Sequence, residues 1–227
     1  MKIHGLQKLT LLDFPEHTAC TVFTAGCNFR CPFCHNASLV ECRGDEISTA
    51  DFFAFLEKRK GLLDGVAITG GEPLLQPDIK EFIKEIRARG YAVKLDTNGS
   101  FPDKLKELLD EKLLDYVAMD VKSSPEEYRI AAGVSVDFEK IKRSMALIRE
   151  SGTPYEFRTT AVGGIHTAKS LEGVARLMLP QDKWFLQQFV DSGDILGSDV
   201  GAFTPDQMRL LASRLQNIAP QLTLRGL

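Results

Sequence analysis

The sequence predicts an α/β fold in which parallel strands and helices alternate and form a partial barrel. Short apolar runs rich in β-branched residues are separated by longer stretches whose apolar residues recur at helical spacing. Strands joined through helices run parallel with right-handed crossovers. The chain shows about six such units, too few for the usual closed eight-stranded barrel. A partial (β/α)6 barrel is therefore the first choice, and an open doubly wound sheet is the second.

The expected strands are short and mostly apolar, as parallel strands are when helices cover both faces of a sheet. They span residues 19–24, 66–69, 91–96, 116–120, 155–160 and 184–189. In either arrangement the chemistry is expected at the carboxyl ends of these strands.

The expected helices have recognisable ends. Ser48 is an N-cap residue before the apolar stripe that contains Phe52 and Leu56, and Gly61 follows the last turn. Gly90 stands at the same position after a second helical stretch. The helices are expected over residues 49–60, 77–89, 102–112, 137–150, 168–179 and 205–218.

The composition is that of an ordinary globular protein. The chain has 227 residues, of which 44% are hydrophobic, and its 28 Lys and Arg against 31 Asp and Glu give a formal net charge of -3. This balance excludes a disordered or collagen-like chain and shows no basic footprint for nucleic acid, so a protein or small-molecule partner is favoured. No uncharged apolar stretch is long enough to span a bilayer, and Asp13 interrupts any signal-peptide core. We therefore expect one domain over 1–227, with no membrane partner, in the cytoplasm where thiols stay reduced.

Three of the five cysteines are close together directly after the first expected strand. Cys27, Cys31 and Cys34 have the spacing C-x3-C-x2-C, and closely spaced thiolates in a reduced compartment favour iron–sulfur clusters or zinc over disulfides. Zinc with His35 or Cys42 as the fourth ligand is one alternative, and haem attachment through C-x-x-C-H is another. The third is a four-iron cluster held by three cysteines, which leaves one iron open to a substrate or cofactor.

Polar residues follow the next three expected strands. The segments are Thr69-Gly70-Gly71-Glu72-Pro73, Asp96-Thr97-Asn98-Gly99 and Asp120-Val121-Lys122. Taken singly, they could be tight turns or a solvated ion pair. Because the carboxyl ends of parallel strands converge, we expect these residues to surround one volume, with Gly70 and Gly71 leaving room for a ligand.

The last two expected strands add further candidates. Strict alternation places Glu156, Arg158 and Thr160 on one side, toward the lumen. The guanidinium fork of Arg158 suits a carboxylate, and an ordinary salt bridge is the alternative. Gln188 is expected to face the pocket, or else to have a structural role.

The segment Cys-Asn-Phe-Arg-Cys-Pro-Phe-Cys-His-Asn, with Phe33 directly before the last cysteine, resembles the radical S-adenosylmethionine (SAM) superfamily. Within it, the segment looks like the branch of glycyl-radical-enzyme activating enzymes. The resemblance implies a radical SAM-type partial barrel with a core over 18–190, an N-terminal extension over 1–17 and a C-terminal helix and tail over 203–227. It also implies a [4Fe-4S] cluster on Cys27, Cys31 and Cys34.

The same resemblance implies how SAM is held. It implies that Gly70, Gly71 and Glu72 bind the methionine amino group of SAM. It also implies that Asp96, Thr97 and Asp120 lie beside the SAM carboxylate and a nearby monovalent cation. The resemblance also implies that Lys122 contacts SAM and that Asn98 contacts its ribose. With SAM as the ligand, the guanidinium fork of Arg158 suits the SAM carboxylate, and Gln188 is expected near the adenine.

The resemblance further implies the reaction. Reductive cleavage of SAM at the cluster yields a 5'-deoxyadenosyl radical, which installs a glycyl radical on a partner enzyme. The chain has Gln187-Gln188-Phe189 where activators of pyruvate formate-lyase have a Y-H-x-x-G-type segment, and Glu16 where glycine is common. It is therefore more similar to anaerobic ribonucleoside-triphosphate reductase activating proteins. Only two cysteines lie outside the motif, so an external donor such as flavodoxin or ferredoxin is expected.

Two other functions stay open from the sequence. One is radical chemistry on a small molecule, as in 7-carboxy-7-deazaguanine synthases. The other is a zinc-binding interaction module without catalytic activity.

Overall fold

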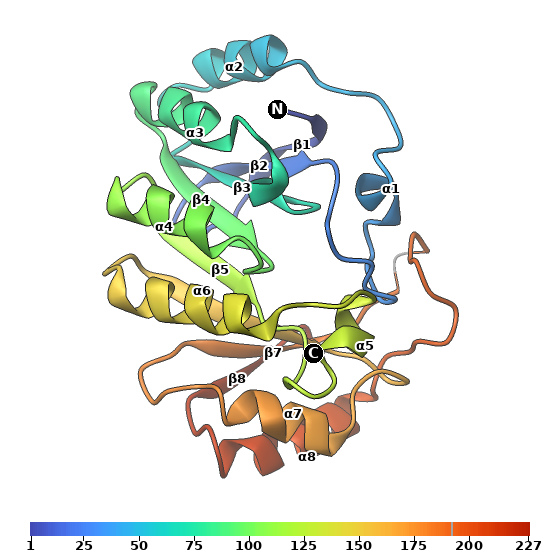
Figure 1. The fold of residues 1–227 in the computed structure, drawn as a ribbon. Coiled ribbons are helices and arrows are strands. Elements are labelled where there is room, and N and C mark those ends of the chain that lie inside the picture. Colours follow the sequence, from blue (N-terminus) through green and yellow to red (C-terminus); the bar gives the residue numbers. More distant parts are fainter. Residues whose placement is uncertain (192) are drawn as a thin grey trace.

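The computed structural model describes residues 1–191 and 193–227 and contains one eight-stranded sheet with the strands in sequence order (Figure 1). The strands are β1 (Ile3–Thr10), β2 (Ala19–Thr24), β3 (Gly65–Gly70), β4 (Ala92–Thr97), β5 (Tyr116–Asp120), β6 (Tyr155–Ala161), β7 (Trp184–Gln188) and β8 (Leu222–Arg225). From β2 to β8 each strand is parallel to the next, as the sequence predicts.

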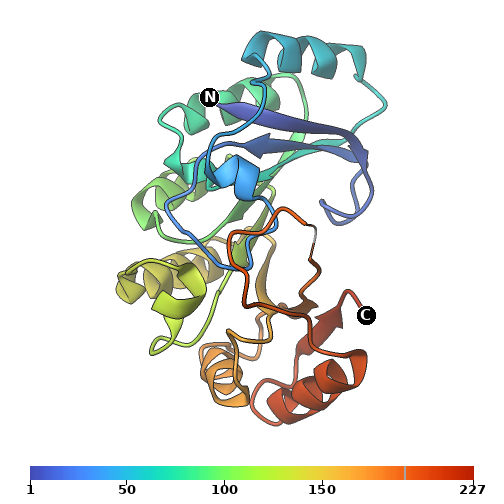
Figure 2. The same ribbon diagram turned by 90° about the vertical axis from the view of Figure 1, so that its right-hand side faces the viewer.

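The sheet is a partial barrel with two free edges. Within the described part of the sheet, β1 is the edge strand beside β2, to which it is antiparallel, and β8 is the edge strand beside β7; β1 also forms one isolated bridge, between Ile3 and Ile47. Figure 2 shows the helices on the outside of the curved sheet, with β1 and β8 apart from each other on one side of the molecule. The partial-barrel prediction is confirmed, with two strands that the sequence analysis did not predict. One of them, β1, lies in the segment expected to be an N-terminal extension.

The helices lie close to the expected ranges but are mostly shorter. The longer ones are α2 (Thr49–Lys58), α3 (Ile79–Ala88), α4 (Pro102–Asp110), α6 (Phe138–Glu150), α7 (Ala168–Ala175) and α8 (Pro205–Gln216). Ser48 accepts a hydrogen bond from the Asp51 N–H at the start of α2, and Thr167 and Thr204 form capping boxes at α7 and α8. Three short segments were not expected, namely α1 (Ala37–Val40), η1 (Pro73–Leu75) and α5 (Tyr128–Ala132).

The apolar core lies between the sheet and its helices. Val66, Ile68 and Val93 are fully buried there. A second apolar cluster closes the amino end of the barrel, where Phe14 packs with Tyr116 at a ring-centroid distance of 6.4 Å. The lumen therefore has a closed apolar end and a polar end, and the polar end is the one formed by the carboxyl ends of the strands.

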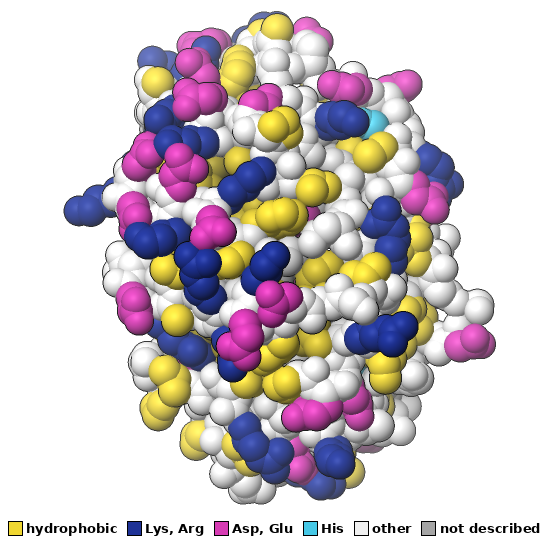
Figure 3. Space-filling model, viewed as in Figure 1, with side chains coloured by type: hydrophobic (Ala, Val, Ile, Leu, Met, Phe, Trp, Pro, Cys, Tyr) yellow, Lys and Arg dark blue, Asp and Glu magenta, His cyan; other side chains and the backbone are white. Residues whose placement is uncertain are grey.

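The outer surface carries both signs of charge. Figure 3 shows Lys and Arg interspersed with Asp and Glu over the face that includes α3, α4 and α6. Several form exposed ion pairs, such as Lys80 with Glu107 and Glu111. None of the helices in the described ranges is both long and apolar enough to cross a membrane.

Candidate active site

One cavity of about 350 Å³ occupies the polar end of the lumen. It brings together the cysteine loop after β2 and the carboxyl ends of β3, β4, β5 and β6, which are separated by up to about 130 residues in the sequence. Its lining includes most of the residues that the sequence predicts, namely Cys27, Cys31, Phe33, Cys34, Gly70, Gly71, Asp96, Thr97, Asn98, Asp120, Lys122 and Arg158. The predicted convergence on one volume is therefore confirmed.

The cysteine loop is held by backbone hydrogen bonds to distant segments. The Gly26 N–H donates to Leu39 O at 2.8 Å, and the Arg30 N–H donates to Ala132 O at 2.8 Å. Within the loop, the Phe29 N–H donates to Cys27 Sγ at 3.3 Å. The unexpected helices α1 and α5 thus supply the acceptors that position this loop.

The thiols of the loop lie in a setting that disfavours an isolated thiolate. Burial raises the pKa of Cys27 to about 11 and that of Cys31 to about 12. Deprotonated sulfur at these positions therefore needs a cation such as iron as its counter-charge, and a soft metal centre fits this donor set. Among the described residues, no three His, Cys, Asp or Glu side chains are arranged to hold a single metal ion. The cysteines of an iron–sulfur cluster ligate separate irons and need not meet at one point.

The two cysteines outside the motif are placed differently. Cys20 lies on β2 and is fully buried, as expected of a small apolar side chain. Cys42 is exposed and is not part of the cavity lining, whereas His35 is.

Five charged side chains form a continuous chain of ion pairs across the ends of β4, β5 and β6. Lys94 Nζ contacts Asp96 Oδ1, and Arg158 joins the two aspartates, with Nη1 3.1 Å from Asp96 Oδ2 and Nε 2.8 Å from Asp120 Oδ1. Lys122 Nζ completes the chain at 2.9 Å from Asp120 Oδ2. The chain of ion pairs itself carries one net positive charge, and its members Lys122 and Arg158 line the cavity, where their cationic groups suit an anionic ligand group.

The cations keep both aspartates ionised. Burial alone would raise the pKa of Asp96, but Arg158 and Lys94 outweigh it and hold that pKa below its usual value. The pKa of Asp120 is lowered for the same reason, because Arg158 and Lys122 overcome the effect of burial. Lys94 was not predicted as a site residue, although it lies two positions before Asp96 and strand alternation places the two side chains on one face.

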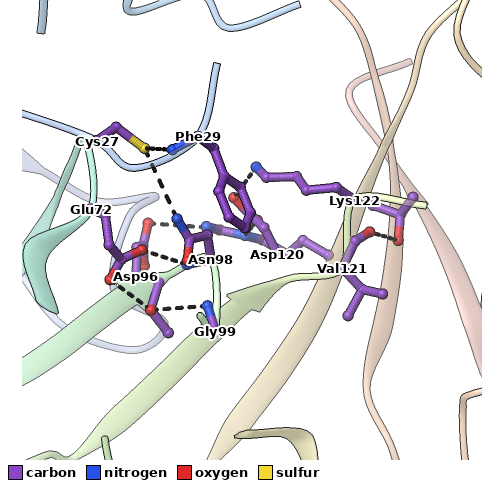
Figure 4. A network of polar contacts seen from close by, with 12 residues as sticks. Cys27, Phe29, Glu72, Asp96, Asn98, Gly99, Asp120, Val121 and Lys122 are labelled. Atoms are coloured by element: carbon purple, nitrogen blue, oxygen red, sulfur yellow. Dashed lines mark hydrogen bonds and ion pairs between the residues drawn. The ribbon is translucent and has the colours of Figure 1, made fainter. Parts of the chain in front are cut away.

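Glu72 is buried beneath the cavity rather than exposed in it. Its Oε1 accepts hydrogen bonds from Leu74 N at 3.0 Å and Thr97 Oγ1 at 2.8 Å. Its Oε2 accepts one from Asn98 N at 2.7 Å (Figure 4). Burial raises its pKa to about 7, although these three donors oppose the shift. The structure thus places Glu72 where it orders the turn after β4.

The two glycines after β3 leave room for the chain itself as well as for a ligand. Gly70 has φ of +112°, and a Cβ on Gly71 would lie 2.1 Å from Gly26 O. Only residues without side chains let the end of β3 approach the segment before Cys27 this closely.

Gln188, like Glu72, is a predicted residue that does not line the cavity. Its Nε2 donates to Phe203 O at 2.6 Å, and Gln187 lines the cavity instead. The reason is strand register, because Gln187 pairs with Thr160 and so shares the lumen face with Arg158 and Thr160. The expectation that Gln188 faces the pocket is wrong.

The cavity also contains residues that the sequence analysis did not propose. They are Gln7, Asp13, Thr21, Phe23, Phe29, Asn36 and Gln187 among others. Asp13 Oδ2 accepts a hydrogen bond from Thr21 Oγ1 at 2.6 Å, which directs its carboxylate to the lumen side of β2. Alternation along β1 and β2 could have indicated Gln7, Thr21 and Phe23, whereas Asp13, Phe29 and Asn36 lie on loops and gave no such signal.

His166 supports the cavity from the turn after β6. Its Nδ1 accepts from the Val162 N–H at 3.1 Å and its Nε2 donates to Lys122 O at 2.8 Å. Burial lowers its pKa, so the ring stays neutral, and it packs against Phe33 with centroids 6.0 Å apart. The sequence analysis did not assign it a role.

Comparison with known proteins agrees with this site. The family model described as "Radical SAM superfamily" matches residues 21–178. A Methanocaldococcus jannaschii protein named "Putative glycyl-radical enzyme activating enzyme MJ1227" is 31% identical over 192 residues, which cover 82% of this chain and 79% of that protein. The pyruvate formate-lyase-activating enzyme of Listeria monocytogenes is 33% identical over 56% of each chain.

A solved structure supports the fold. Streptococcus suis SuiB bound to its precursor peptide SuiA superposes with a TM-score of 0.72 at 13% identity. The alignment covers 91% of this chain and 48% of SuiB, so this chain spans about half of that protein.

Proposed function

The chain belongs to the radical SAM superfamily of enzymes, and from this premise we propose that it is an activating enzyme that installs a glycyl radical on a partner protein. The observation that carries the proposal is the placement of the three motif cysteines in one cavity with the carboxyl ends of four parallel strands. The 31% identity to a relative named for glycyl-radical enzyme activation supports the choice of reaction. Family membership also excludes the alternative of a zinc module without catalytic activity.

The residues present fit the cofactors of this family. Cys27, Cys31 and Cys34 would hold a [4Fe-4S] cluster, since they offer soft ligands in a setting that needs positive charge. When bound, the cluster and SAM supply a 5'-deoxyadenosyl radical that abstracts hydrogen. The chain itself binds and orients SAM and excludes water from the cavity.

The charged groups would orient SAM. Lys122 and Arg158 line the cavity, and these two cations would attract the SAM carboxylate. Gly70 and Gly71 would admit the methionine amino group. Thr97 and Glu72 would act indirectly, by ordering the turn that carries Asn98.

Lys94 would take the place of the monovalent cation that the resemblance implies beside SAM. Both aspartates already contact cationic side chains, and an added ion would compete with Lys94 for Asp96. We therefore expect SAM affinity to be the same in potassium chloride and choline chloride. Replacing Lys94 by methionine should make the affinity depend on potassium, and calorimetric titration of SAM in the two salts checks this. A wild-type affinity that rises with potassium would show that an ion binds despite Lys94.

The partner we propose is an anaerobic ribonucleotide reductase, because the segment around Gln187 and Gln188 differs from that of pyruvate formate-lyase activators. An external protein such as flavodoxin or ferredoxin would donate the electron, and a reducing cytoplasm suits such chemistry. Mixing the reconstituted chain with SAM, reductant and candidate glycyl radical proteins tests the proposal. A glycyl radical signal in the electron paramagnetic resonance (EPR) spectrum of the reductase supports it. A signal only with another partner corrects the partner, and turnover of a small molecule alone contradicts the proposal.

The cysteines provide a direct test of cofactor binding. Replacing Cys27, Cys31 or Cys34 by alanine should abolish reductive cleavage of SAM, because each supplies one cluster ligand. The matched controls are Cys20→Ala and Cys42→Ala, which remove a thiol outside the motif and should retain cleavage. The measurement is 5'-deoxyadenosine formed per enzyme. Full activity without Cys31 would contradict the assignment.

A further inference from the structure

Three side chains next to Cys27 form a closed ring of hydrogen bonds. Asn28 Nδ2 donates to Ser100 Oγ at 2.9 Å, and Ser100 Oγ donates to Asn98 Oδ1 at 2.6 Å. Asn98 Nδ2 closes the ring by donating to Asn28 Oδ1 at 3.0 Å. Each side chain gives and accepts one hydrogen bond within the ring, so the direction of every bond is determined by the others.

The ring determines which way the Asn98 amide points. Asn98 Oδ1 also accepts from the Ser100 N–H at 3.0 Å, so the oxygen faces two donors and the nitrogen must face the cysteine loop. The second N–H of that nitrogen points to Cys27 Sγ at 4.0 Å, the long end of the range for a hydrogen bond to sulfur (Figure 4). The Phe29 N–H donates to the same sulfur at 3.3 Å.

Asn98 is also held from beneath. Its backbone N–H donates to Glu72 Oε2 at 2.7 Å, and the residue is 6% exposed. The amide is thus ordered before any cofactor binds, and no rotamer freedom remains to be lost when Cys27 becomes a cluster ligand. Because the amide oxygen and nitrogen of Asn98 already form hydrogen bonds within the ring, little hydrogen-bonding capacity is left for the ribose contact that the resemblance implies.

Hydrogen bonds to the cysteine sulfurs are one of the factors that determine the reduction potential of an iron–sulfur cluster. The added electron makes the sulfur ligands more negative, so a donor stabilises the reduced cluster more than the oxidised one. We infer that Asn98, oriented by Asn28 and Ser100, is a positioning residue that raises the reduction potential of a cluster held by Cys27. The inference rests on the cluster of the proposed function and is independent of the partner protein.

The test is a redox titration of the full chain with its reconstituted cluster, followed by EPR without SAM or partner. At a fixed solution potential, Asn98→Leu should lower the ratio of reduced to oxidised cluster about three- to tenfold, and tenfold corresponds to about 59 mV for one electron. The control is Asn217→Leu, because Asn217 is an exposed asparagine at the end of α8 and does not line the cavity. An unchanged ratio in Asn98→Leu, or an equal fall in both variants, overturns the inference.

A second variant covers the case in which Asn98→Leu does not load the cluster. Ser100→Ala opens the ring but keeps Asn98 and its bond from the Ser100 backbone, so a smaller fall in the same direction is expected. An unchanged potential in Ser100→Ala then overturns the inference. In deuterated water, pulsed EPR should detect two exchangeable couplings near Cys27 in the wild type and one in Asn98→Leu. A shifted potential without a glycyl radical on any partner leaves this inference standing and contradicts only the proposed function.

Discussion

At the scale of single residues, the same chemical group takes different states in one cavity. Asp96 and Asp120 are buried, yet each carboxylate has two cationic neighbours that keep its pKa low. Glu72 is fully buried as well, but its neighbours are neutral donors and its pKa rises to about 7. The presence of a cation, and not burial alone, decides which carboxylate stays charged.

The raised pKa of Glu72 predicts a pH-dependent stability. A carboxyl group whose pKa is raised in the folded state stabilises the fold below its unfolded value, near 4.5, and that contribution is lost as the pH rises through about 7. Relative to Glu72→Gln, the free energy of unfolding of the wild type should fall by up to about 3 kcal/mol between pH 5 and pH 8. Chemical denaturation of both proteins at several pH values measures this. A constant difference across that range would contradict the assignment.

Several residues proposed from the sequence come together in the structure, while their roles stay predictions. The motif cysteines, Asp96, Asp120 and Arg158 were proposed from the sequence and meet at one cavity. Lys94 was missed because a lysine within an apolar strand run gives no signal of its own. Its role depends on Asp96 being buried beside it.

At the scale of elements, the site depends on the loops that leave the strands. The end of β3 passes directly beneath the segment that precedes Cys27, and the Gly71 N–H donates to Thr24 O at 2.8 Å. From the sequence, Gly71 is expected to leave room for a ligand. The structure shows that Gly26 of the chain's own cysteine loop also occupies this space.

A side chain at position 71 should therefore disturb the cluster loop as well as SAM binding. A Cβ there would lie 2.1 Å from Gly26 O and 2.7 Å from Gly26 C, so the backbone before Cys27 must move. We expect Gly71→Ala to lose most of its bound iron and about 1–3 kcal/mol of stability. Iron analysis and thermal unfolding measure the two effects.

Gly201→Ala is the matched control, because no atom lies within 4 Å of its added Cβ. Normal iron content in Gly71→Ala would mean that the loop adapts without cost, and the close approach would then have no structural importance.

At the scale of the whole molecule, side-chain contacts tie the last strand to the interior of the sheet. Arg225 on β8 forms a bidentate pair with Glu156 on β6, with Nη1–Oε1 at 2.9 Å and Nη2–Oε2 at 3.1 Å. Tyr116 donates to Glu156 Oε2 at 3.2 Å, and the Arg225 guanidinium stacks over Phe185 at 3.7 Å. Glu156 is 3% exposed, so Arg225 on β8 supplies the cation that pairs with a buried carboxylate.

Replacing one member of this ion pair should lower the free energy of unfolding more than replacing both members. Arg225→Leu leaves a buried carboxylate without its cation, and we expect a loss of about 1–3 kcal/mol, since Arg225 itself is partly exposed. The double variant Arg225→Leu with Glu156→Gln should recover part of this loss. Denaturant unfolding of the three proteins forms the test. Additive losses would show that the pair is not coupled.

The sequence by itself determined the alternation of strands and helices, the cysteine motif and the polar ends of the strands. These features are local, because hydrophobic period, caps and ligand spacing are all properties of short segments. It did not predict β1 or β8, because an antiparallel edge strand and a four-residue strand are stabilised mainly by their neighbours in the sheet.

Only the tertiary structure decided which side chains meet. The ring of Asn28, Ser100 and Asn98 joins segments about 70 residues apart, and the register of β7 against β6 turns Gln187 rather than Gln188 into the cavity. Contacts of this kind are set by strand register and by the approach of two loops. Both depend on the packing of the whole sheet, and no short segment of the sequence encodes that packing.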